Sequence, residues 1–411
     1  MDNRNRKMTI DLLRDSVKRY SIFVLSWFIT NSVWAQMHNY DTNFEYSLHH
    51  FVDTIPIEIE KNQIFVWVEI NGKQHRFNID TGSSQGVVYQ DSHLDNHIEL
   101  GRVVSRDAAG NRDTVRVIQL PPMKIGRLGI TNYVASVFTR HRSHQNYDAI
   151  LGFDLLNKGL CCKIDARQKH IILTDRRDFF DQEPGYGIRY KLKWFVPYLF
   201  VSPFKRHVDE VLFDTGSRHL YTMNKQSFDQ HAYKSKNVES QVESRARGSF
   251  AIGHLGAERT DEVAFLNLDR LKWDEFSFNR VRAITTQGAS RIGAQILDYG
   301  TITINGFRRK ITFQPYQGVD SIEVNNPLPR IAYIPRFGRP VIGLILEDCN
   351  EYRAGLRQGD MILAINGKSV DSFDEFINYS FVEDRVYLIL VKTKDGRNKE
   401  VTFTYQSRIT P

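Results

Sequence analysis

The tetrapeptide Asp-Thr-Gly-Ser occurs twice in this chain, at residues 80–83 and 214–217, and each copy directly follows a short apolar run. A single copy could be an ordinary turn, because Asp and Gly suit tight turns for local reasons. Two copies at matched places in two similar halves need a common explanation. Such a duplication can bring two carboxylates, those of Asp80 and Asp214, together within one folded chain.

The repetition extends to both sides of the motif. Upstream, alternating apolar residues and an Asn71-Gly72 turn lead to Asp80, and residues 190–217 repeat that order with a polar turn near Lys205-Arg206. Downstream, Gly152 lies 72 residues after Asp80 and Gly293 lies 79 residues after Asp214. The preserved spacing predicts two structurally similar units.

Short alternating apolar runs and frequent turn residues predict an all-β fold for both halves. We place the first unit at residues 54–175 and the second at residues 188–315, joined by a linker rich in charge, Pro and Gly. Helical signals are short, and they lie chiefly after Gly152 and Gly293. The apolar fraction of 41% is sufficient for sizeable cores.

Two carboxylates held close together cannot both ionise readily, so one keeps its proton and can act as an acid while the other acts as a base. Asp80 and Asp214 are therefore the candidate catalytic residues, and their titration belongs to the pair. We expect the hydroxyls of Thr81 and Thr215 to turn inward and to bond across the interface between the two units.

The remaining loop residues are expected to support the carboxyl groups. Gly82 and Gly216 would let backbone N–H groups approach the carboxylates, which a Cβ atom would obstruct. Ser83 and Ser217 could donate hydrogen bonds to the outer carboxylate oxygens. Such bonds favour the charged form and would favour activity at acidic pH.

Residues 54–315 resemble the pepsin/retropepsin superfamily of aspartic proteases, in which an Asp-Thr/Ser-Gly loop is followed by two apolar residues and a Gly. Ile150-Leu151-Gly152 matches that second signature, whereas Arg291-Ile292-Gly293 has an arginine in place of the first apolar residue. The resemblance implies a two-lobed, duplicated retropepsin-like fold in which Gly152 and Gly293 lie behind the catalytic loops. It also implies a catalytic monomer, since one chain carries both motifs.

Members of this superfamily close a hairpin flap over the substrate. In the first half the best candidate is the polar tip at residues 107–111, which includes Ala108, Ala109 and Gly110. In the second half, residues 248–256, with Gly253, occupy the equivalent place. Neither tip has the tyrosine of pepsin-type flaps.

Residues 330–406 resemble a small α+β PDZ domain, on the strength of the run from Ala354 to Gly367. Ser372 and Glu375 predict a capped helix in this domain. PDZ domains bind the carboxyl ends of peptides by adding a strand to a sheet edge, and we expect the carboxylate-binding loop at residues 334–338. A structural cap over the protease is the alternative role.

The first 35 residues read as a signal peptide, with six basic residues, a short apolar stretch and Val33-Trp34-Ala35 before the expected cleavage point. This predicts an exported protein, periplasmic or secreted; an uncleaved signal would instead anchor it in a membrane. Removing the segment would reduce the net charge from +7 to +4, a mild value that indicates no nucleic-acid partner. Cys161, Cys162 and Cys349 are expected to be buried thiols rather than disulfides.

The sequence therefore predicts an exported aspartic endopeptidase that acts on protein or peptide substrates through a water activated by Asp80 and Asp214. The alternative is a non-catalytic peptide-binding or scaffold protein built from the same modules. We expect no cofactor and no metal, because the histidines have no carboxylate or cysteine at ligand spacing.

Overall fold

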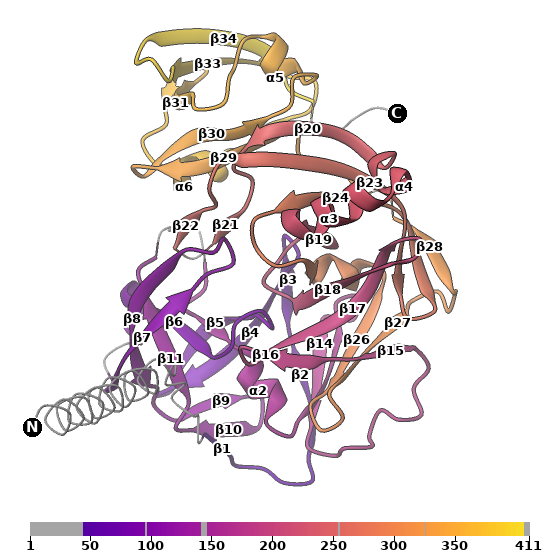
Figure 1. The fold of residues 1–411 in the computed structure, drawn as a ribbon. Coiled ribbons are helices and arrows are strands. Elements are labelled where there is room, and N and C mark those ends of the chain that lie inside the picture. The colour runs from indigo at the N-terminus through magenta and orange to yellow at the C-terminus, as the bar shows by residue number, and fades with distance from the viewer. Residues whose placement is uncertain (1–43, 95–96, 141–145, 254, 325, 407–411) are drawn as a thin grey trace, which may run out of the picture. The chain divides into compact units, whose positions relative to one another are not determined.

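The computed structural model of this protein describes residues 44–406 apart from residues 95–96, 141–145, 254 and 325. The predicted signal peptide at residues 1–35 lies outside this part of the chain. The described residues form mostly β-strands, which confirms the prediction of a mainly β fold (Figure 1). None of the helices among them is both long and apolar enough to cross a lipid bilayer.

The first half of the chain contributes an eleven-stranded sheet. Its strands, in spatial order, are β1 (Glu45–Tyr46), β10 (Leu128–Thr131), β9 (Met123–Ile125), β4 (Gln63–Ile70), β5 (Lys73–Ile79), β12 (Ala149–Leu151), β6 (Gly86–Tyr89), β11 (Val134–Phe138), β8 (Arg112–Gln119) and β7 (Ile98–Arg106), with β3 (Glu58–Glu60) paired to β4. The Asn71-Gly72 turn joins β4 to β5 with φ angles of 51° and 74°, the positive values that a tight hairpin needs.

The second half contributes a nine-stranded sheet. Its strands, in spatial order, are β16 (Lys191–Lys193), β17 (Val196–Phe204), β18 (His207–Asp214), β25 (Arg291–Gly293), β19 (Tyr221–Asn224), β24 (Phe276–Thr286), β23 (Asp261–Trp273) and β20 (Val242–Gly248), with β28 (Ser321–Glu323) paired to β24. The order β4-β5-β12-β6-β11-β8-β7 of the first sheet recurs here as β17-β18-β25-β19-β24-β23-β20. The parallel pairs also correspond, since β12 runs parallel to β5 as β25 does to β18.

A six-stranded sheet contains strands from both halves. Its strands, in spatial order, are β15 (Tyr186–Arg189), β27 (Lys310–Pro315), β26 (Gly300–Asn305), β13 (Cys161–Asp165), β14 (His170–Thr174) and β2 (Val52–Pro56). The two halves meet where β13 pairs antiparallel with β26, with Ile164 opposite Ile302. One apolar core includes buried residues of both halves, so the halves are joined by packing as well as by the chain.

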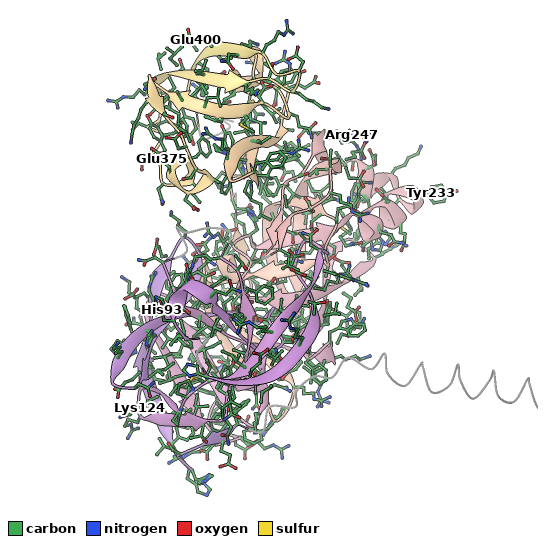
Figure 2. All side chains as sticks on the ribbon, turned by 90° about the vertical axis from the view of Figure 1, so that its left-hand side faces the viewer. His93, Lys124, Tyr233, Arg247, Glu375 and Glu400 are labelled. Carbon is green, nitrogen blue, oxygen red and sulfur yellow. The ribbon has the colours of Figure 1, made fainter. Side chains whose placement is uncertain are left out.

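Helices are short in both halves. They are η1 (Gln90–Ser92), α2 (Phe153–Asn157), α3 (Lys225–Lys234), α4 (Lys236–Glu239) and η2 (Ala294–Asp298). As predicted, α2 follows Gly152 and η2 follows Gly293. The sequence did not predict α3, which begins after Asn224, whose side chain accepts a hydrogen bond from the Ser227 N–H. Tyr233 projects from α3 into solvent with 92% of its surface exposed (Figure 2).

All three cysteines are buried free thiols, as predicted. Burial raises the pKa of Cys161 and of Cys349 to about 12, and it also raises the pKa of Cys162. These thiols are therefore protonated and structural at ordinary pH.

The carboxy-terminal domain, residues 330–406, forms a separate sheet with two short helices. Its strands are β29 (Ile331–Arg336), β30 (Arg339–Ile345), β31 (Met361–Ile365), β32 (Lys368–Ser369), β33 (Val386–Lys392) and β34 (Asn398–Thr404), and its helices are α5 (Asn350–Arg353) and α6 (Phe373–Ile377). The Ser372 side chain caps α6 by accepting a hydrogen bond from the Glu375 N–H, as the sequence predicted.

The expected carboxylate-binding loop at residues 334–338 is not a loop. Residues 334–336 belong to β29 and pair with residues 339–341 of β30, and Phe337 and Gly338 form the hairpin turn with φ angles of 52° and 73°. The prediction of a loop over residues 334–336 is therefore wrong, because these residues extend β29 and only Phe337 and Gly338 lie in the turn.

The carboxy-terminal domain packs against the second half through an apolar cluster. Leu344 and Leu346 of this domain are buried in one cluster with Val263 and Phe265 of β23. The Ser249 N–H, just beyond β20, also donates a 2.9 Å hydrogen bond to the Gly343 carbonyl oxygen. The domain therefore covers apolar surface that the second half would otherwise expose.

Leu344→Ala should destabilise this interface by about 2 to 5 kcal/mol, because it removes a fully buried side chain from a shared cluster. Urea unfolding followed by tryptophan fluorescence would measure the change. Leu388→Ala, at a 39% exposed position of the same domain, is the matched control. Equal losses in the two variants would contradict the shared packing.

Candidate active site

The two Asp-Thr-Gly-Ser loops leave the ends of corresponding strands. The first follows β5 and the second follows β18, and in each half a later strand, β12 or β25, is inserted beside the strand that carries the motif. The Asp80 N–H donates to the Leu151 carbonyl oxygen over 3.0 Å, and the Ala294 N–H donates to the Ser217 carbonyl oxygen over 2.8 Å. The inserted strand β12, and the residue directly after the inserted strand β25, therefore hold the two loops by backbone hydrogen bonds.

Gly152 and Gly293 lie directly behind these loops. A Cβ atom at Gly152 would come within 2.5 Å of the Gln85 carbonyl oxygen, and one at Gly293 within 2.3 Å of the His219 carbonyl oxygen. Neither backbone position leaves space for a side chain, which explains the glycine that the sequence repeats at both places.

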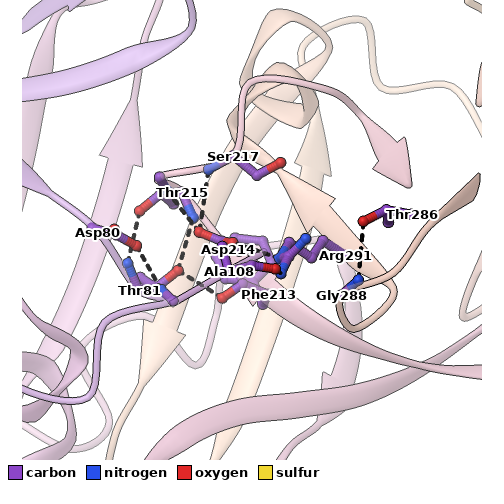
Figure 3. A network of polar contacts seen from close by, with 12 residues as sticks. Asp80, Thr81, Ala108, Phe213, Asp214, Thr215, Ser217, Thr286, Gly288 and Arg291 are labelled. Atoms are coloured by element: carbon purple, nitrogen blue, oxygen red, sulfur yellow. Dashed lines mark hydrogen bonds and ion pairs between the residues drawn. The ribbon is translucent and has the colours of Figure 1, made fainter. Parts of the chain in front are cut away.

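The two threonines lock the loops to each other. The Thr81 N–H donates to Thr215 Oγ1 and the Thr215 N–H donates to Thr81 Oγ1, each over 3.0 Å. The Thr81 hydroxyl then donates to the Phe213 carbonyl oxygen over 2.7 Å, and the Thr215 hydroxyl to the Ile79 carbonyl oxygen over 2.8 Å (Figure 3). Both threonines are almost fully buried, so this symmetric set of bonds has no competition from water.

This lock brings the two carboxyl groups together. A Cβ atom at Gly82 would lie 2.5 Å from Asp214 Cγ, and a Cβ atom at Gly216 would lie 2.4 Å from Asp80 Oδ2. Each carboxyl group therefore rests on the backbone of the opposite loop, where only glycine fits. The structure thus brings together Asp80 and Asp214, which lie 134 positions apart.

Backbone N–H groups, rather than serine hydroxyls, stabilise the carboxylates. Asp80 Oδ1 accepts from the Gly82 N–H over 2.8 Å, and Asp214 Oδ1 accepts from the N–H groups of Gly216 and Ser217 over 3.0 and 3.2 Å. The Ser83 hydroxyl instead donates to the Gln85 carbonyl oxygen over 2.8 Å. The expectation that Ser83 donates to a carboxylate is wrong, because the loop turns its side chain toward its own backbone.

Burial changes the acidity of both carboxyl groups. Desolvation raises the pKa of Asp80, and it raises the pKa of Asp214 to about 7, with the neighbouring Asp80 charge as the second cause. The guanidinium of Arg291 opposes this rise at Asp214. The pair therefore retains a proton well above the pH at which an exposed Asp loses it.

Arg291 is a further residue of this site, although its sequence position predicts only a departure from the expected apolar residue. Its Nε atom lies 3.1 Å from Asp214 Oδ2, and its Nη2 donates to the Ala108 carbonyl oxygen over 2.7 Å (Figure 3). Only 7% of Arg291 is exposed. The signal available in the sequence was the arginine at a position where the other half has Ile150.

The predicted flap of the first half is the hairpin of β7 and β8. Residues 107–111 form its tip, because Arg106 pairs with Arg112. Asp107 organises the tip by accepting hydrogen bonds from the N–H groups of Ala109 and Asn111 over 3.0 and 2.8 Å. The Gly110 N–H donates to the Asp107 carbonyl oxygen, and Gly110 has a positive φ of 87°. Through the Ala108 carbonyl oxygen this tip contacts Arg291 beside the carboxyl pair.

The candidate tip of the second half meets the first. It contains β21 (Ile252–Gly253) and β22 (Gly256–Ala257), and the Leu255 N–H between them donates to Asp107 Oδ2 over 2.8 Å. A Cβ atom at Gly253 would lie 2.2 Å from the same oxygen, so this glycine permits the contact. The two tips are therefore linked to each other, and the first tip is also linked to Arg291.

Buried Glu258 anchors the second tip, and no sequence pattern indicated this role. Its Oε1 accepts from the N–H groups of Phe250 and Ala251, and its Oε2 accepts from the Thr286 hydroxyl and the Gln287 N–H. One carboxylate thus joins the base of the tip to the loop that precedes Arg291.

Comparison with known proteins supports an assignment at the family level. Residues 66–155, which include the first Asp-Thr-Gly-Ser loop and Gly152, match the family model described as aspartyl protease. No curated protein matched the sequence. The match supports aspartic protease character for this segment, and it does not extend to the second loop.

Thr81→Val should lower the free energy of unfolding by about 2 to 4 kcal/mol, because it leaves the Phe213 carbonyl oxygen and the Thr215 N–H buried without a partner. Thr81→Ser keeps the hydroxyl, so its free energy of unfolding should fall much less. Urea denaturation of both variants tests this expectation. A valine variant as stable as the native chain would show that the hydroxyl contributes nothing to stability.

Asp80→Asn should stabilise the protein at pH 8 relative to the native chain. The folded-state pKa of Asp80 is raised above its unfolded value. The stability that this carboxyl group contributes is therefore fully present below about pH 4, and it is lost as the pH rises through the raised pKa. The difference in stability between the variant and the native chain should therefore shrink as the pH falls toward about 4. Thermal unfolding across this range measures it, with Asp269→Asn, an exposed carboxylate of β23, as the control. A constant difference across the range would contradict the raised pKa.

Proposed function

We propose that this protein is an exported aspartic endopeptidase that hydrolyses peptide bonds with Asp80 and Asp214 as a catalytic pair. The observation that carries the proposal is the position of each carboxyl group against the backbone of the opposite loop, at Gly82 and Gly216. Two buried carboxyl groups at such close range share one proton, which is the protonation state that this chemistry needs.

In the proposed reaction a water molecule held between the two carboxyl groups attacks the carbonyl carbon of the substrate. The ionised carboxylate removes a proton from that water as the new C–O bond forms, and the protonated carboxyl group donates its proton to the carbonyl oxygen. Collapse of the resulting diol breaks the C–N bond, and the leaving nitrogen takes a proton from the pair. No covalent intermediate with the enzyme forms.

The matching strand order of the two sheets supports a duplicated, two-lobed catalytic unit. Both carboxyl groups come from one chain, so we propose that the monomer is sufficient for catalysis. The tips at residues 107–111 and 252–257 would have to move apart to admit a substrate, because they contact each other and the first tip also contacts Arg291.

We further propose that the carboxy-terminal domain is a PDZ domain whose main role is structural. The shared cluster around Leu344 and the bond from Ser249 to Gly343 connect it to the base of the second tip. Capture of a peptide carboxyl end is the second possible role, and only Phe337 and Gly338 of the expected binding loop lie in a turn. Export through the signal peptide at residues 1–35 can be tested by amino-terminal sequencing of the mature protein.

Purified protein should cleave a denatured protein substrate in a pepstatin-sensitive reaction, and Asp80→Asn or Asp214→Asn should reduce the rate by about 100- to 10,000-fold. The rate should fall as the pH rises above about 7, because the raised pKa of Asp214 sets the upper limit of the singly protonated pair. Mass spectrometry of the products measures the cleavage, and circular dichroism checks that both variants fold. If the native protein cleaves nothing between pH 3 and about pH 8, the non-catalytic peptide-binding alternative replaces this proposal.

A further inference from the structure

The two halves of the candidate site use equivalent backbone positions with different side chains. Ile150 of β12 pairs with Asn78 of β5, and Arg291 of β25 pairs with Leu212 of β18. Each lies two positions before the glycine behind its catalytic loop. Arg291 therefore holds in the second half the place that Ile150 holds in the first.

The residues next to these two positions are also more polar in the second half than in the first. In the first half Phe65 lies opposite Asn78, and Val87 lies opposite Ile150. The corresponding partners in the second half are Tyr198, opposite Leu212, and Thr222, opposite Arg291. Three apolar positions of the first half are thus occupied in the second by two hydroxyl groups and a guanidinium.

The first-half face is apolar, and an aliphatic side chain from another segment already packs on it. Phe65, Val87 and Ile150 belong to a cluster separate from the main core, completed by Tyr89, Val115, Phe138 and Tyr147. Leu255, from the tip of the second half, packs against this cluster. The face therefore accepts a large apolar side chain.

The corresponding face of the second half carries a positive charge at the equivalent strand position. The Arg291 guanidinium lies between the Asp214 carboxyl group and the Ala108 carbonyl oxygen of the flap tip (Figure 3). Gly288 leaves space for this arrangement, because a Cβ atom there would lie 2.3 Å from the Ala108 carbonyl oxygen and 2.7 Å from Arg291 Nη2. A substrate that enters beneath the flap must separate Ala108 from Arg291.

Opening the flap removes the Ala108 carbonyl oxygen from Arg291, whose Nε atom keeps the Asp214 carboxyl group 3.1 Å away. Loss of a hydrogen bond by a buried charged group is costly, so a substrate group that replaces the Ala108 carbonyl oxygen is favoured. A carboxylate is the strongest replacement, because it can accept two parallel bonds from a guanidinium. Thr222 Oγ1, buried and without a hydrogen-bond partner among the described residues, is a second polar group on the neighbouring strand.

We infer, on the basis of the protease function proposed above, that this site cleaves peptides with a large apolar side chain on the first-half side of the scissile bond and an acidic side chain on the second-half side. The apolar side chain takes the position of Leu255 against the first-half cluster. The acidic side chain binds Arg291, which makes Arg291 a specificity-determining residue.

Pairs of fluorogenic peptides that differ only in Glu or Gln at one position, within two residues of the cleaved bond, test this inference. The full-length native protein should cleave the Glu peptide with a kcat/KM about 10- to 100-fold higher than that of the Gln peptide, as the loss of a charged hydrogen bond predicts. In Arg291→Met the two values should agree within about twofold, and Arg291→Lys should retain part of the preference. The ratio of the kcat/KM for the Glu peptide to that for the Gln peptide does not depend on any general loss of rate in these variants.

Arg245→Met is the matched control, because Arg245 is a surface arginine of the same half that pairs with Glu239 and Glu262. It should keep the full preference for Glu. Equal cleavage of the two peptides by the native protein, or an unchanged preference in Arg291→Met, overturns the inference.

A second measurement separates this inference from the proposed function. The same peptide pair, made with a reduced, uncleavable bond at the scissile position, is titrated against the native protein and Arg291→Met by fluorescence polarisation. If no peptide is cleaved but the Glu ligand binds at least tenfold more tightly than the Gln ligand, and only when Arg291 is present, hydrolysis fails while acidic recognition stands. Equal binding of the two ligands to the native protein rejects the recognition itself.

Discussion

The reciprocal bonding of Thr81 and Thr215 is the interaction on which the rest of the site depends. Two loops from separate halves of the chain exchange four hydrogen bonds through buried threonines. Because each threonine binds both the backbone N–H of its counterpart and a carbonyl oxygen of the opposite half, neither loop can shift alone. The close contact of the two carboxyl groups follows from this fixed geometry, and the burial that accompanies it is the main cause of their raised pKa values.

The backbone, rather than the side chains, carries the symmetry of the two halves. Seven strands recur in the same order, and backbone hydrogen bonds to each inserted strand, or to the residue directly after it, hold the catalytic loops. Side chains on that scaffold were therefore free to diverge. The substitution of a guanidinium for an aliphatic group at Arg291 changes the charge beside one carboxyl group while the strand pairing remains that of Ile150. A symmetric scaffold thus supports an asymmetric site.

The contacts around the site form a continuous series that reaches the carboxy-terminal domain. Gly343 of that domain bonds to Ser249, Glu258 anchors the segment that follows, and Leu255 bonds to Asp107 of the opposite tip. Asp107 in turn shapes the tip whose Ala108 carbonyl oxygen meets Arg291. Each link is a hydrogen bond of a buried or partly buried group, so the closed position of the tips is supported from both sides.

The sequence by itself determined the β class, the turn at Asn71-Gly72, the short helices after Gly152 and Gly293, and the identity of the paired motif. These features rest on local rules of alternation and turn geometry, or on repetition that can be counted. Only the tertiary structure decided that the Ser83 hydroxyl faces its own loop, that residues 334–336 extend β29 up to a turn at Phe337 and Gly338, and that Arg291 and Glu258 belong to the site. These outcomes depend on contacts between segments far apart in the chain, and side-chain direction within a loop is set by those contacts rather than by local propensity.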